Sequence, residues 1–128
     1  MYSNLWYKNL IQPPLTPIPE VFGFVWPVLY ILIFISLAFY ILKPKFNKEV
    51  GYFYFIVQFV LNIIWAPIFF RAQNILLALI VLILLDIFAF LTIRKFFMVS
   101  KISGFLFVPY FLWILFATYL NIGYLILN

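Results

Sequence analysis

The stretch QNILLALIVLILLDIFAFLTI, residues 73–93, decides the fold class of this chain. Beyond its first two residues it is almost wholly apolar, and its one carboxylate, Asp86, lies near its middle. About 20 apolar residues in a helix span the hydrocarbon core of a bilayer. A continuous apolar run, about twice as long as a barrel strand and without alternation, favours a helix over a strand. We therefore expect residues 73–93 to form a transmembrane helix.

Three further segments share this character, and they lie at residues 21–42, 51–70 and 102–127. Short connections between the four segments require antiparallel neighbours. The expected fold is an all-α integral membrane bundle of four up-down helices in a single domain, residues 1–128. Residues 1–20 contain four prolines, which lack the N–H of a regular helix and restrict the residues before them. This segment is expected to be a stiff loop outside the membrane.

The composition of the 128 residues excludes most soluble and enzymatic classes. Apolar residues make up 69% and charged residues 9%, whereas about 25% of a soluble domain is charged. The chain has neither Cys nor His, so it lacks the usual zinc ligands and the Ser-His and Cys-His nucleophile pairs. No metal site is expected. The net charge of +5 comes from short clusters between apolar runs, which argues against nucleic acid as a partner.

Basic residues are distributed unevenly over the two sides of the expected bundle. The first and third connections share one side, while the N-terminal segment, the second connection and the C-terminus share the other. The first side carries Lys43, Lys45, Lys48, Arg94, Lys95 and Lys101, and the second carries Lys8 and Arg71. Cytoplasmic loops of membrane proteins have an excess of Lys and Arg. We therefore expect a multi-pass protein with both termini on the non-cytoplasmic side.

Polar side chains near mid-depth are candidate functional residues. A charge at the bilayer centre costs at least about 2.5–3.5 kcal/mol on insertion scales, so Asp86 is expected to face the bundle interior. Gln58 and Asn62 lie one turn apart on one face of the second span. One interpretation joins the three residues in a buried site for a ligand or a proton. The other treats them as interhelical hydrogen bonds, typically about 0.6 kcal/mol each.

Aromatic residues form a second set of candidates. Phe22, Trp26 and Tyr30 recur every four residues in the first span, which places them on one helical stripe. A second stripe in the last span follows steps of three and four: Tyr110, Trp113, Ala117, Asn121 and Tyr124. Trp26 and Trp113 lie deeper than the interfacial belt of most membrane tryptophans. Their rings could stack on a flat conjugated ligand, or they could serve only to pack helices together.

Several motifs resemble those of the translocator protein, or tryptophan-rich sensory protein (TspO), family. They cover nearly the whole chain in the family's order and spacing. The matching residues are Trp6-Tyr7, Leu10, Pro13, Thr16-Pro17, Val21-Phe22, Val25-Trp26, Leu29-Tyr30, Gln58, Leu61-Asn62, Trp65, Phe69-Phe70, Asn74, Ala78, Pro109 to Trp113 and Phe116 to Asn121.

The resemblance implies an internal pocket that opens towards the Pro-rich loop and accepts porphyrins and other flat hydrophobic ligands. By position, Trp26 and Trp113 correspond to pocket tryptophans, Asn62 and Ala117 to lining positions, and residues 6–19 to a lid. The family has five spans, the first before the Trp-Tyr pair, so the chain is expected to lack that helix. The expected ligand-binding residues are Phe22, Trp26, Tyr30, Gln58, Asn62, Trp65, Asp86, Tyr110, Trp113, Ala117 and Asn121.

A porphyrin of the protoporphyrin IX or haem type is the expected ligand, with no covalently bound cofactor, in sensing, transport or porphyrin handling. One alternative function is light- and oxygen-dependent porphyrin breakdown, in which Trp26 and Trp113 would be catalytic. Another is a proton-coupled exporter of lipophilic cations that uses Asp86, and a further one is a structural membrane subunit. The resemblance also implies a homodimer through residues 51–70, although Gly51 and Ala66 are the only small residues there that favour close helix approach.

Overall fold

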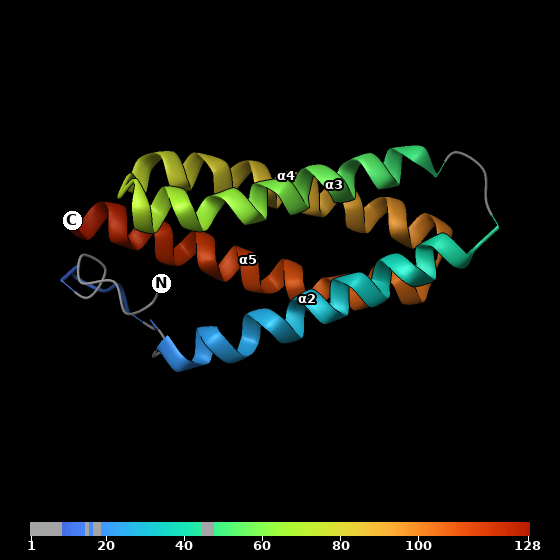
Figure 1. The fold of residues 1–128 in the computed structure, drawn as a ribbon, viewed down its shortest axis with the longest axis horizontal. Coiled ribbons are helices and arrows are strands. Elements are labelled where there is room, and N and C mark those ends of the chain that lie inside the picture. Colours follow the sequence, from blue (N-terminus) through green and yellow to red (C-terminus); the bar gives the residue numbers. More distant parts are fainter. Residues whose placement is uncertain (1–8, 15, 17–18, 45–47) are drawn as a thin grey trace.

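The computed structural model describes residues 9–14, 16, 19–44 and 48–128, and it is helical throughout most of that length (Figure 1). The helices are α2 (Pro19–Leu42), α3 (Glu49–Ala66), the short π-helix η1 (Pro67–Arg71), α4 (Ile75–Val99) and α5 (Lys101–Leu127). Four helical segments are long and apolar enough to cross a membrane. The described residues contain no strand. The expectation of an all-α membrane bundle is confirmed.

Short polar side chains define where the last two helices begin. Asn74 caps α4, since its Oδ1 accepts a hydrogen bond from the Leu77 backbone N–H at 2.9 Å. Gln73, just before this cap, has a φ of 55° and turns the chain from η1 into α4. Ser100 caps α5 and also ends α4, so a single residue connects these two helices.

The third helix is longer than the apolar run that predicted it. We expected residues 73–93, but α4 continues to Val99 and so includes Arg94 and Lys95. Phe96 and Val99 in the added turns are buried, which gives these turns an inward apolar face. The long basic side chains can reach the bilayer surface from within a helix, so they do not need to end it.

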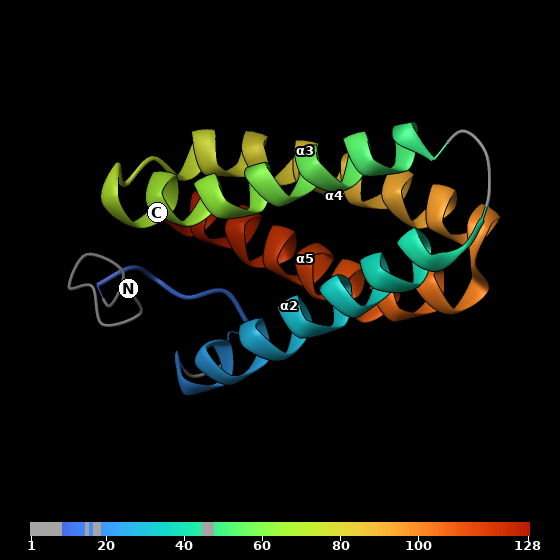
Figure 2. The ribbon, with the colours of Figure 1, turned by 45° about the vertical axis from the view of Figure 1, so that its right-hand side comes forward.

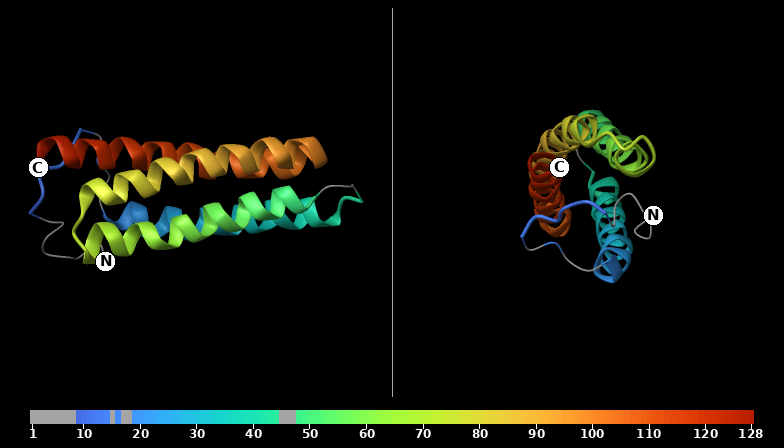
Figure 3. Two further views of the ribbon diagram at one scale, coloured as in Figure 1. Left: turned by 90° about the horizontal axis from the view of Figure 1, so that it is seen from above. Right: turned by 90° about the vertical axis from the view of Figure 1, so that its left-hand side faces the viewer.

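The four spans form an open row rather than a closed ring. α2 packs against α5, α5 against α4, and α4 against α3. Seen along its length, the bundle is an arc with α2 and α3 at its two ends (Figure 3). α2 and α3 diverge towards the end of the bundle that holds the C-terminus (Figures 1 and 2). Aromatic side chains link the two helices, for example Phe34 of α2 with Phe59 of α3 at 5.3 Å between ring centroids.

The two ends of the bundle differ in what they carry. One end holds the end of α2, the start of α3 and the junction between α4 and α5 (Figure 1). The other end holds residues 9–14, η1 and the C-terminus, and we call it the lid end. This arrangement places the expected extramembrane segment and the C-terminus on the same side, as an up-down bundle requires.

A reciprocal pair of hydrogen bonds fastens α2 to α5. The Ser36 hydroxyl donates to the Ser103 carbonyl at 2.5 Å, and the Ser103 hydroxyl donates to the Ser36 carbonyl at 2.6 Å. Both serines are fully buried. Small polar residues let helix backbones approach closely in lipid and satisfy one another there.

Gly51 provides space for a buried tyrosine near the start of α3. Tyr40 stacks on Phe96 with ring centroids 4.3 Å apart, and its hydroxyl donates to the Lys48 carbonyl at 2.8 Å. A Cβ added at Gly51 would lie 2.2 Å from the Tyr40 hydroxyl oxygen and 3.1 Å from Lys95 Cγ. The space beside Gly51 is therefore occupied by side chains of the same chain. The homodimer through residues 51–70 stays a prediction, and Gly51 does not offer it an open surface.

We predict that Gly51→Ala destabilises the bundle by about 1–3 kcal/mol, because overpacking forces Tyr40 away from Phe96 and from its acceptor. A lowered Tm in detergent micelles is the measurement. Gly23→Ala in α2 is the matched control, since nothing lies within 4 Å of its added Cβ. The control is expected to keep or raise the Tm, because Ala is the better helix former by about 1 kcal/mol. Equal losses in both variants would contradict this packing.

Candidate functional site

Two tryptophans from helices far apart in sequence meet inside the bundle. Trp26 of α2 and Trp113 of α5 lie edge to face, with ring centroids 6.2 Å apart and planes at 83°. Both indoles are half-buried and pack against buried core residues. The two aromatic stripes thus meet through these two indoles.

Further rings extend this contact along and across the helices. Tyr30 lies 5.8 Å from Trp26 by ring centroids, and Phe116 lies 5.5 Å from Trp113. Phe59 of α3 lies 6.2 Å from Tyr30. The result is a continuous aromatic wall contributed by α2, α5 and α3. Edge-to-face rings at these separations attract one another through their quadrupoles.

The bundle has two buried apolar clusters, and three tryptophans lie where they adjoin. The larger cluster includes Ile33, Leu85 and Phe107, and the smaller one, at the lid end, includes Phe69 and Tyr124. The three indoles each contact both clusters, and they belong to Trp26, Trp65 and Trp113. The aromatic wall therefore occupies the junction between two separately packed regions.

A polar network lies beside the aromatic wall. The Tyr110 hydroxyl donates to Gln58 Oε1 at 2.7 Å and accepts from Asn62 Nδ2 at 2.9 Å. The Tyr30 hydroxyl donates to Asn62 Oδ1. Gln58 and Tyr110 are fully buried and Asn62 nearly so. Within the described residues Gln58 Nε2 is buried without a hydrogen-bond partner, so it is a donor available to a guest.

Trp65 and Asn121 form a second polar contact nearer the lid end. The indole Nε1 of Trp65 donates to Asn121 Oδ1 at 3.0 Å, and Asn121 Nδ2 donates to the Ile75 carbonyl at 3.1 Å. This chain of bonds joins α3, α5 and the first turn of α4. Ala117, one turn before Asn121, is buried beneath it.

Asp86 makes an interhelical hydrogen bond to α5. Its Oδ2 accepts from the Thr118 hydroxyl at 2.5 Å, across the α4–α5 contact. That hydroxyl also lies 2.9 Å from the Ile114 carbonyl, one turn earlier in α5. No hydrogen bond joins Asp86 to Gln58 or Asn62 in the described part of the chain. Asp86 is thus half-buried at the α4–α5 contact, and its grouping with the two amides in one ligand site stays a prediction.

The whole chain was compared with known proteins. It matches the TspO/MBR family over residues 1–127. The chain belongs to the TspO/MBR family. It is 38% identical over 129 residues to the tryptophan-rich protein TspO of Chlorobaculum tepidum. The matched region covers 98% of this chain and 81% of that protein.

Two further relatives extend the comparison beyond one group of organisms. The tryptophan-rich protein TspO of Archaeoglobus fulgidus is 39% identical over 96% of this chain and 80% of its own length. The tryptophan-rich sensory protein of Cereibacter sphaeroides is 33% identical over 96% of this chain and 77% of its own length. The resemblance drawn from motifs is confirmed, and the chain is an integral multi-pass membrane protein of this family.

The Pro-rich segment of this TspO/MBR member is anchored on α5. Pro13 is buried against Gly123, where an added Cβ would lie 2.4 Å from the proline ring. The Tyr119 hydroxyl donates to the Pro14 carbonyl at 2.7 Å. Ile11 and Asn128 exchange two hydrogen bonds, of 2.9 and 3.0 Å. The part of the lid at residues 9–14 thus covers the lid end of α5.

Some expected residues lie outside what the structure describes. They include four residues of the expected lid, Trp6, Tyr7, Leu15 and Pro17, and the side chain of Phe22. Other residues were not expected and belong to the site's framework: Phe59, Phe116, Tyr119 and Asn128. Phe59 carried no distinguishing signal in a chain with 18 phenylalanines. Phe116 and Tyr119 fall within the matched motif Phe116 to Asn121, which could have pointed to them.

We predict that Tyr110→Phe lowers the stability of the bundle by about 1–2 kcal/mol, because the hydroxyl bonds two amides that lipid cannot satisfy. Thermal unfolding in detergent micelles measures this loss. Tyr52→Phe is the control, since no hydrogen bond of the Tyr52 hydroxyl is found within the described chain. If the two variants unfold at the same temperature, the Tyr110 network does not hold α3 to α5.

Proposed function

We propose that this TspO/MBR member binds porphyrins and similar flat hydrophobic ligands between α2 and α5, with the indoles of Trp26 and Trp113 as the facing walls. The edge-to-face meeting of these two half-buried rings in the membrane interior is the observation that carries the proposal. Aromatic faces bind conjugated rings without needing a charge or a metal.

The way α2 is attached supports entry of a ligand at this place. The hydrogen bonds that join α2 to α5 within the described residues are those of Ser36 with Ser103. Towards the lid end, no hydrogen bond joins α2 to α5 in the described residues, and Trp26 meets Trp113 there. Ring contacts can separate and re-form without leaving an unsatisfied polar group, whereas the serine pair cannot. α2 would therefore swing about Ser36, with Tyr30 releasing Asn62 of α3, and so part the indoles and admit a planar guest.

The polar groups beside the wall would orient that guest. Gln58 Nε2 is a buried hydrogen-bond donor without a partner in the described structure. Tyr30 and Asn62 could exchange their mutual bond for bonds to ring nitrogens of a porphyrin. The carboxylates of a porphyrin would stay in water at the lid end, because burying them without a cation is costly. A few polar groups within an apolar site give orientation and specificity.

The name of one relative supports a sensing role. The protein of Cereibacter sphaeroides is named a tryptophan-rich sensory protein. In this chain, a ligand between α2 and α5 would also reach the helix that carries the lid anchors Tyr119 and Asn128. Binding would thus be coupled to the lid, which faces the aqueous phase and can present the change to a partner.

We predict that replacing both indoles, Trp26→Leu with Trp113→Leu, weakens protoporphyrin binding about ten- to a hundredfold. Each lost aromatic contact contributes about 0.5–1.5 kcal/mol beyond its area. Titration of the porphyrin absorption band against purified protein in micelles gives the Kd.

Phe24→Leu is the matched control for this titration. Phe24 is two residues from Trp26 on the outer face of α2, and 73% of it is exposed. The control should bind protoporphyrin like the unmodified chain. A double tryptophan variant that folds and keeps its affinity would refute the site.

We also propose that the lid end faces the non-cytoplasmic side. The opposite end carries Lys43, Lys48, Arg94, Lys95 and Lys101 among the described residues, and the lid end carries Arg71. An excess of Lys and Arg marks the cytoplasmic side of membrane proteins.

Single cysteines test this orientation cleanly, because the chain has none of its own. Ala72→Cys at the lid end should react with an impermeant maleimide in intact cells, whereas Pro44→Cys at the other end should react only after the membrane is permeabilised. Both residues are exposed, so neither substitution disturbs the core. The reverse labelling pattern would invert the orientation.

A further inference from the structure

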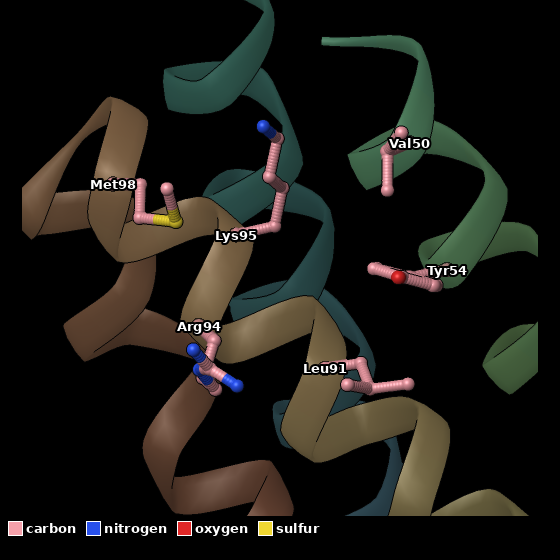
Figure 4. Close-up of a pocket in the computed structure, with 6 residues that line it drawn as sticks. All are labelled: Val50, Tyr54, Leu91, Arg94, Lys95 and Met98. Carbon is pink, nitrogen blue, oxygen red and sulfur yellow. The ribbon is translucent and has the colours of Figure 1, made fainter. Parts of the chain in front are cut away.

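A pocket of about 190 Å³ lies between α3 and α4, at the end of the bundle opposite the lid (Figure 4). Val50 and Tyr54 face it from α3 (Figure 4). The side chains that face it from α4 are those of Leu91, Arg94, Lys95 and Met98. None of these residues takes part in the aromatic wall or its polar network, so this pocket is separate from the site described above.

Two cations and a phenol supply the polar chemistry of this pocket. Arg94 is exposed and Lys95 half-buried. No ion pair is found within the described chain, so neither cation is neutralised by a carboxylate there. Arg offers a planar fork of donors that matches a phosphate in a bidentate way, and Lys adds a point charge beside it. An anion with several oxygens is therefore the ligand that these groups recognise.

The apolar half of the pocket fits an anion that is joined to an apolar tail. Val50, Leu91 and Met98 complete the wall, and a free phosphate makes no use of them. One and two turns further into the membrane on the same face of α4, Ile87 is 50% and Leu84 42% exposed. These residues form an apolar track that leads from the cations towards the bilayer centre, as an acyl chain would.

The position along the helices matches the depth of a lipid headgroup. Arg94 and Lys95 lie in the last turns of α4, directly after the apolar run that spans the hydrocarbon. Basic clefts between transmembrane helices at this level bind anionic lipid headgroups. Lys43, Lys48 and Lys101 lie at the same end and raise the local positive potential, with Glu49 as the one acidic residue described there.

We propose that this pocket binds one anionic phospholipid, with its phosphate between Arg94 and Lys95 and an acyl chain along Leu91, Ile87 and Leu84. The lipid would contact α3 through Val50 and Tyr54 and so bridge the two helices at the start of α3. A lipid that binds only the folded bundle stabilises it, and this stabilisation grows with the logarithm of the lipid concentration above the Kd.

Native mass spectrometry of the full chain, released from micelles with equal amounts of phosphatidylglycerol and phosphatidylcholine, tests the proposal. The unmodified chain should retain one phosphatidylglycerol in preference to phosphatidylcholine. Arg94→Gln with Lys95→Gln should lower that retention about tenfold or more. Lys101→Gln is the matched control: it removes an exposed charge from the same end but outside the pocket, and it should retain lipid normally.

Two further measurements separate lipid binding from misfolding and from binding of free phosphate. The swapped pair, Arg94→Lys with Lys95→Arg, keeps both charges and should retain the lipid, which guards against a glutamine variant that merely fails to fold. Inorganic phosphate at the lipid's concentration should not displace phosphatidylglycerol. Displacement by phosphate, equal retention of phosphatidylcholine, or equal loss in Lys101→Gln would each overturn the proposal.

Discussion

The Tyr110 hydroxyl is the contact on which the interior of this bundle depends. It bonds Gln58 and Asn62 of α3 from its position on α5, and Asn62 in turn accepts from Tyr30 of α2. Three helices thus meet at polar groups that the surrounding hydrocarbon cannot satisfy, so each helix is fixed in rotation about its axis. With α2 and α5 fixed in this way, Trp26 and Trp113 face inward. The proposed porphyrin site is a consequence of that rotation.

The spans and the inward aromatic stripes could be predicted from the sequence because both follow from local regularity. A lipid environment forces the backbone into helices, and helical spacing then places Trp26 with Tyr30 and Trp113 with Ala117. The extension of α4 past Arg94 and Lys95 was not predicted, because charge was taken as the end of the span. In the structure the buried Phe96 and Val99 give the added turns an inward apolar face, and the helix ends at Ser100.

Contacts between helices were less accessible to prediction. Depth grouped Asp86 with Gln58 and Asn62 in one interpretation, but depth could not show that the Asp86 carboxylate accepts a hydrogen bond from Thr118. Depth is read from one helix at a time, whereas partners depend on how two helices face one another. The Ser36–Ser103 pair and the pocket beside Arg94 could not be predicted either, because each is formed by residues that are remote in sequence. The hydrogen bonds of Tyr119 and Asn128 to residues 11–14 also join distant parts of the chain.

The single residue between α4 and α5 has a consequence for how the chain enters the bilayer. Ser100 ends one helix and caps the next, so no slack separates the two. The chain from Ile75 to Leu127 can therefore insert as a preformed hairpin, whose two backbones shield one another early. α2 has no such short connection to α5 in the chain, and its place against the hairpin comes from its packing on α5.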